Sequence, residues 1–144
     1  MSKLRELSHD LGATIYFFST DDNDLELYGD VKGLYLPEYD IIYIRDDLSR
    51  TEQENVILHE LGHCNRGHIH YTIHSKMYSS KQEAEADYYM IEYRFKEWIS
   101  HWDFEPEIYE LKIERFMKAY EFNNTLFNLC EKVINGYCGY YETA

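Results

Sequence analysis

The sequence is poor in basic residues and lacks the segments that membrane insertion or export requires. Only 14 Lys and Arg oppose 27 Asp and Glu, which gives a formal net charge of −13 with histidine neutral. A surface this acidic repels phosphate backbones and anionic lipids, so direct binding to nucleic acid or to a membrane surface is not expected. No uncharged apolar run approaches the ~20 residues that span a bilayer. The first residues, Met1 to Glu6, contain no apolar stretch of the kind found in a signal peptide.

Cysteine and proline are also scarce. The 3 cysteines are an odd number without the spacing of a disulfide framework, which favours reduced thiols in a cytoplasm. The 2 prolines, Pro37 and Pro106, stand in no Pro/Gly/Ser linker, and no repeat divides the chain. A chain of 144 residues with 44% hydrophobic residues is long enough to bury one core. The sequence therefore predicts a single cytoplasmic domain over residues 1–144 and leaves its oligomeric state open.

Hydrophobic periodicity and turn residues predict strands early in the chain and helices late. Ser/Thr-x-x-Glu capping patterns mark two helix starts, at Thr51–Glu54 and Ser80–Glu83. The expected elements are a helix over 2–11, a strand over 14–18, a β-hairpin with strands 33–36 and 41–44, and helices over 52–66, from 80 onward, after Pro106 (from about Ile108 and Leu111) and over 126–134. This order indicates an α+β fold with a small antiparallel sheet.

The segment His59-Glu60-Leu61-Gly62-His63 matches the H-E-x-x-H pattern and lies within a predicted helix. Histidines at positions i and i+4 share one helical face, so both imidazoles can reach one metal ion. Glu60 then lies beside the metal, where it can act as the general base of a zinc-dependent hydrolase. Leu58 and Leu61 fall on the other side and are expected to anchor the helix to the core.

A catalytic zinc requires a third protein ligand. The metzincin pattern is excluded because Arg66 and Ile69 occupy the positions at which it needs glycine and histidine. His68, His70 and His74 remain possible ligands. His68 and His70 would need a turn directly after the helix, and the alternation His68-Ile69-His70 fits a surface loop or strand equally well.

The other candidate for the third ligand lies on the second capped helix. Glu83 and Asp87 are four residues apart and share a face, whereas Glu85 points away. One carboxylate facing the metal and another one turn further on suit a ligand and an acceptor for a histidine N–H. The alternative is that Glu83 caps its own helix and Asp87 is a solvated charge.

The string HELGH at 59–63, followed by EAEAD at 83–87, resembles the ImmA/IrrE family of phage- and mobile-element-associated metallopeptidases, which are zincins of the gluzincin type. The resemblance covers about residues 1–100 and leaves 105–144 for C-terminal helices. It implies a zincin-like domain in which zinc is bound by His59, His63 and Glu83, Glu60 is the catalytic base and Asp87 orients a ligand.

In zincins the strand before the active-site helix borders the cleft, so the resemblance places Ile41–Arg45 there. An exposed edge at that strand would bind substrate by strand addition.

The predicted function is that of a zinc endopeptidase acting on an intracellular protein. The resemblance implies a helix-turn-helix repressor of the same mobile element as substrate, and an acidic surface suits a basic DNA-binding protein. The alternative is an anti-repressor that sequesters its partner and keeps a structural or vestigial zinc. Glu60 favours the enzyme, because a purely structural site has no use for a general base.

Overall fold

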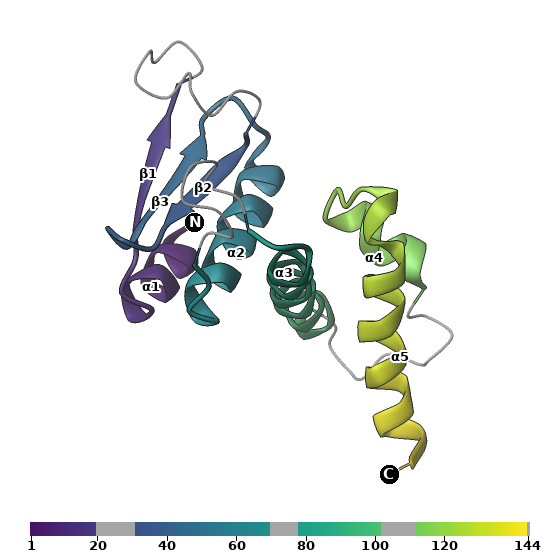
Figure 1. The fold of residues 1–144 in the computed structure, drawn as a ribbon. Coiled ribbons are helices and arrows are strands. Elements are labelled where there is room, and N and C mark those ends of the chain that lie inside the picture. Colours follow the sequence, from purple (N-terminus) through teal and green to yellow (C-terminus); the bar gives the residue numbers. More distant parts are fainter. Residues whose placement is uncertain (20–30, 70–77, 102–111, 144) are drawn as a thin grey trace. The chain divides into compact units, whose positions relative to one another are not determined.

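The computed structural model describes residues 1–19, 31–69, 78–101 and 112–143, which divide into two compact units, Met1–Ala86 and Asp87–Ala144. The elements are α1 (Ser2–Asp10), β1 (Thr14–Phe18), β2 (Gly33–Leu36), β3 (Ile41–Arg45), α2 (Arg50–Asn65), α3 (Ser80–Ser100), α4 (Ile113–Ala119) and α5 (Phe127–Thr143) (Figure 1). The α+β class is therefore confirmed. A single domain over the whole chain stays a prediction, and Ile108 and Leu111, expected in a helix, lie outside the described residues.

The three strands form one sheet in the order β1-β3-β2. The predicted hairpin is present, because β2 and β3 pair antiparallel with Tyr35 opposite Ile42. β1, however, pairs parallel with β3, with Ile15 opposite Ile42. The sheet is thus mixed, and the prediction of an antiparallel sheet is wrong for this pair. The pairing joins segments far apart in sequence, so turn residues and periodicity carry no signal for it.

The central position of β3 decides how a peptide could pair with this sheet. Because β3 has a neighbour on each side, Ile41–Arg45 offers no free edge, and the prediction of strand addition there is wrong. Among the described strands, β2 is an edge strand on the side away from β3.

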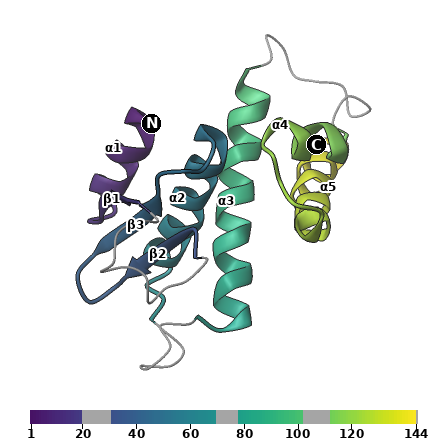
Figure 2. The same ribbon diagram turned by 90° about the horizontal axis from the view of Figure 1, so that it is seen from above.

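The core of the first unit lies between the sheet and helices α1 and α2, which both contact it (Figures 1 and 2). Ile42 and Ile44 are fully buried, as are Leu58 and Leu61 on α2, so the predicted anchoring of this helix is confirmed. The alternate residue Tyr16 lies on the opposite face of the sheet and is 52% exposed.

Gly33 lets β2 approach α2 closely. A Cβ at this position would lie 2.4 Å from Cγ1 of Val56 and 3.2 Å from the carbonyl oxygen of Tyr43, so no larger residue fits without a shift. The close approach brings the backbone of β2 beside α2, the helix that carries the H-E-x-x-H motif.

The second unit has an aromatic core. Phe116 of α4 is fully buried and its ring lies 5.5–5.6 Å from those of four neighbours, Phe95, Trp98, Tyr120 and Phe122. α5 continues to Thr143, beyond the predicted end at residue 134, because Gly136 is accommodated inside the helix. Within the described part of the chain, no helix is long and apolar enough to cross a membrane.

Candidate metal centre

The helix that carries the motif begins two residues before the predicted start. The hydroxyl oxygen of Ser49 accepts a hydrogen bond of 3.1 Å from the backbone N–H of Glu52, so Ser49, not Thr51, is the N-cap of α2. From this start the helix runs without interruption to Asn65 and includes both histidines. Their rings meet edge to face with centroids 4.9 Å apart, which confirms that they share one helical face.

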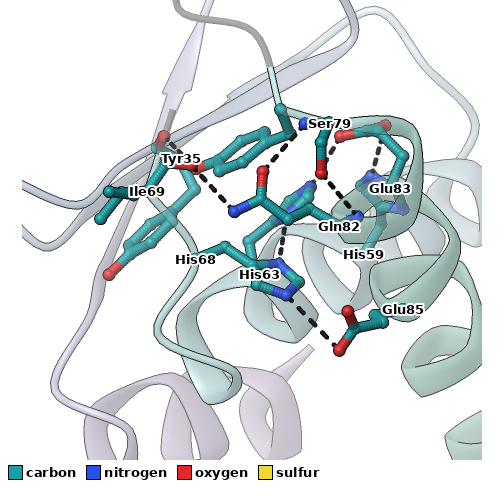
Figure 3. A network of polar contacts seen from close by, with 10 residues as sticks. Tyr35, His59, His63, His68, Ile69, Ser79, Gln82, Glu83 and Glu85 are labelled. Carbon is teal, nitrogen blue, oxygen red and sulfur yellow. Dashed lines mark hydrogen bonds and ion pairs between the residues drawn. The ribbon is translucent and has the colours of Figure 1, made fainter. Parts of the chain in front are cut away.

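The start of α3 shows that Glu83 does not cap its own helix. The Ser79 hydroxyl oxygen accepts a hydrogen bond of 3.1 Å from the N–H of Gln82. The Gln82 side-chain oxygen in turn accepts one of 2.8 Å from the N–H of Ser79. This reciprocal capping box lies one residue before the predicted one. Glu83 is thereby left free to turn toward α2 (Figure 3).

Glu83 meets both histidines of the motif. Its Oε1 lies 2.9 Å from Nε2 of His63, and its Oε2 lies 3.3 Å from Nε2 of His59. The three residues offer ligand atoms that all lie within 4.8 Å of one another. Burial acts to raise the pKa of Glu83, but the two imidazoles outweigh it and hold the pKa far below its usual range. The structure thus brings the three predicted ligands together.

The donor set fits a zinc ion. Two imidazole nitrogens and one carboxylate are the ligands of many catalytic zinc sites. His63 is fully buried, and its Nε2 makes no properly oriented hydrogen bond with any described residue although Glu83 lies beside it. A buried nitrogen in this state lacks the partner that buried polar atoms normally have. A cation held between the three side chains would supply that partner.

Glu60 lies in the same buried region. The residue is 6% exposed, and no described residue forms a hydrogen bond with its Oε2. Burial raises the pKa of Glu60 to about 7, while His59 lowers it, Glu83 raises it, and a hydrogen bond from the backbone of Tyr35 lowers it. A carboxyl with a pKa near neutral pH and one free oxygen is suited to accept and return a proton.

Asp87 lies one turn beyond Glu83 on α3, and its orienting role stays a prediction. His68 does not join the cluster of candidate ligands, since its ring faces the far nitrogen of His63. The other two alternative ligands, His70 and His74, lie outside the described residues. Cys64 points away from the cluster, with Sγ 3.5 Å from the carbonyl oxygen of Leu11.

Tyr78 was not singled out by the sequence. Its ring stacks on His63 with centroids 3.6 Å apart and planes at 10°. Its hydroxyl donates a hydrogen bond of 3.0 Å to the carbonyl oxygen of Tyr35 on β2. Nothing distinguishes this residue from the other tyrosines in the sequence, because its position depends on how the chain returns from α2 to α3. It links the edge strand to the candidate metal site.

Comparison with known proteins is consistent with this site. The family model described as the IrrE N-terminal-like domain, which represents a peptidase family, matches residues 9–97. Searches of the curated proteins and of the solved structures found no match. The matched segment contains both the H-E-x-x-H motif and Glu83, and it makes up more than half of the chain. The chain therefore belongs to the IrrE N-terminal-like family of metallopeptidases.

Proposed function

We propose that this protein is a zinc-dependent endopeptidase that cleaves an intracellular protein. The observation that carries the proposal is the convergence of His59, His63 and Glu83 beside a buried glutamate with a free oxygen. A site that only stabilised the fold would gain nothing from Glu60 at this position, because burying a carboxylate without a full set of partners is unfavourable.

The residues of the site have different roles in peptide hydrolysis. His59, His63 and Glu83 would hold the zinc, which when bound supplies a Lewis acid for the scissile carbonyl and acidifies a water molecule. Oε2 of Glu60 takes the proton of the attacking water and delivers it to the nitrogen of the leaving amine. Tyr35 holds the Glu60 carboxylate in place through its backbone hydrogen bond.

We propose a helix-turn-helix repressor of a phage or mobile element as the substrate. The net charge of −13 supports this choice, since a basic DNA-binding protein is attracted to an acidic enzyme. Attraction of this kind accelerates encounter and weakens as salt screens the charges.

The test combines metal analysis with cleavage of the repressor encoded beside the gene of this protein. The wild type should copurify with or bind one zinc ion per chain and cut the repressor faster at low salt than at high salt. Glu60→Gln should keep zinc and fold but lose cleavage by 10²–10⁴-fold, because only the proton carrier is removed. His63→Ala should lose both zinc and cleavage.

Glu92→Gln is the matched control, because Glu92 is partly exposed on α3 and pairs with Lys96. It should cleave like the wild type. A repressor that is inactivated without being cut, equally by the wild type and by Glu60→Gln, would replace this proposal with the sequestering anti-repressor.

A further inference from the structure

The chain turns back sharply at the end of α2. Gly67 adopts the left-handed conformation with φ +66°, and its N–H donates to the carbonyl of Cys64 at 3.1 Å. The N–H of His68 donates to the carbonyl of His63 at 2.9 Å. These two bonds form a Schellman motif, in which the residue after the glycine packs against the residue five positions earlier. The turn therefore returns His68 to His63.

The two side chains meet inside the protein. His63 is fully buried and His68 is 7% exposed. Their Nδ1 atoms lie 2.9 Å apart, with ring centroids at 5.1 Å. At this distance one nitrogen donates a proton and the other accepts it. A Schellman turn usually has an apolar contact at these two positions, whereas here it has a polar one.

The direction of this hydrogen bond follows from the other nitrogen of His63. Nε2 points toward Glu83 and His59, where a metal ligand must present a lone pair. The proton of the neutral imidazole is then on Nδ1, which donates to Nδ1 of His68. The remaining proton of His68 is on Nε2, which faces Oε2 of Glu85 at 3.7 Å (Figure 3). Arg66 holds the same carboxylate oxygen at 3.5 Å.

We propose that His68, supported by Glu85, is a positioning residue that fixes the tautomer and the ring orientation of His63 for metal binding. The proposal rests on the metal site of the proposed function. His68 thereby accepts the N–H of a histidine ligand, which is the role that the sequence analysis predicted for Asp87. His68 is not one of the three candidate ligands and faces the far nitrogen of His63, so it acts through His63.

Two substitutions of His68, by Asn and by Leu, distinguish a role as hydrogen-bond acceptor from a role in packing alone. Asn places an oxygen near the position of Nδ1 and keeps an acceptor for His63, whereas Leu has the same branching and no acceptor. His68→Leu should lower zinc affinity by 10–100-fold, as loss of an outer partner of a histidine ligand does. His68→Asn should stay within a few-fold of wild type. Zinc affinity is measured by competition with a chromophoric chelator, and far-UV circular dichroism verifies the fold.

The absorption spectrum of bound Co²⁺ reports on ligand geometry, which a merely structural role would leave unchanged. His68→Leu should shift the visible bands of Co²⁺, and His68→Asn should restore the wild-type spectrum. Glu85→Gln should weaken zinc binding less than His68→Leu, because it acts one step further from the metal.

A measurement on the zinc-bound wild type covers the case in which His68→Leu fails to fold. Histidine ¹⁵N chemical shifts identify the tautomer of each ring, and we expect the proton of His63 on Nδ1 and that of His68 on Nε2. The reverse assignment at His68 would overturn the proposal. Wild-type zinc affinity in His68→Leu, or equal loss in His68→Asn and His68→Leu, would also overturn it. These outcomes are independent of the proposed function, which fails if zinc-loaded wild type cuts no repressor.

Discussion

The two units of the molecule enclose different kinds of buried centre. The first unit buries Glu60, His63 and His68, and two atoms of this group have no hydrogen-bond partner among the described residues. The second unit buries Phe116 among four aromatic rings. A buried polar atom without a partner costs about 1–3 kcal/mol, whereas packed aromatic rings stabilise the fold directly.

The difference between the two buried centres indicates which unit depends on a bound cation for its stability. In the first unit, a bound cation would satisfy Nε2 of His63, which the protein leaves unpaired, so metal binding and folding are expected to be coupled there. The aromatic centre of the second unit needs no ligand. The following predictions test this contrast, from the largest expected effect to the smallest.

Phe116→Ala should lower the free energy of unfolding by about 3–5 kcal/mol, because it removes the ring at the centre of the aromatic core. Zinc affinity should not change, since the three candidate ligands belong to the first unit. Urea unfolding and chelator competition measure the two quantities. Phe127→Ala is the control, because Phe127 is 36% exposed and its loss should cost much less. A parallel loss of zinc affinity in Phe116→Ala would contradict the contrast.

Removing zinc should destabilise the first unit by about 2.7 kcal/mol relative to protein held at 100 times the dissociation constant. Hydrogen exchange should accelerate in α2, and the amides of α4 and α5 should exchange as before. His63→Ala should show no difference between zinc and chelator. Equal acceleration in both units would mean that they unfold together, as the single domain predicted from the sequence requires.

Replacement of glycine by alanine should change the stability of the protein in opposite directions at two positions. Gly67→Ala should destabilise the protein by about 1–2 kcal/mol and weaken zinc binding, because Gly67 has φ +66° and its turn carries His68. Gly136→Ala should stabilise α5 by about 0.5–1 kcal/mol, since alanine is the better helix former. Apart from the chain neighbours and, at Gly136, the backbone of its own helix, a Cβ meets no atom within 4 Å at either position, so the difference comes from the local backbone conformation. The measurement is thermal unfolding of both variants. A change of stability in the same direction in both would refute the prediction.

Tyr78→Phe should have a small effect, a loss of about 0.5–1 kcal/mol in the free energy of unfolding. The change removes the hydrogen bond to the carbonyl of Tyr35 and keeps the ring that stacks on His63. Zinc affinity should therefore remain near wild type, as measured by the same competition. Tyr78→Ala, which also removes the stacked ring, should be clearly less stable, and the absence of any difference between the two would argue against a role for the stack.

Local chemistry made much of this fold predictable. The capping pattern and the spacing of His59 and His63 identified the helix and its candidate ligands, because both are properties of a single segment. The two caps were predicted one or two residues late: Ser49 and Ser79 have the same side chain chemistry as their neighbours Thr51 and Ser80. Which of two neighbouring residues becomes the N-cap depends on the backbone conformation at the start of the helix, and the sequence pattern does not determine this conformation.

Contacts between distant segments were the part that sequence patterns could not supply. The parallel pairing of β1 with β3 has no local signature, so the free edge of the sheet was assigned to the wrong strand. The contact of His68 with His63, by contrast, does have a local signature in the sequence. Glycine directly after a helix favours a Schellman turn, and Gly67 directly follows the predicted helix over 52–66.

The hydrogen bond from Gln82 to the carbonyl of Ile69, 3.1 Å long, has a consequence for engineering. It joins the end of the turn after α2 to the first turn of α3, so the two helices that carry the candidate ligands share a direct link (Figure 3). An engineered variant should therefore keep Gln82 and its hydrogen bond to Ile69, because this bond lies between the helices that carry His63 and Glu83.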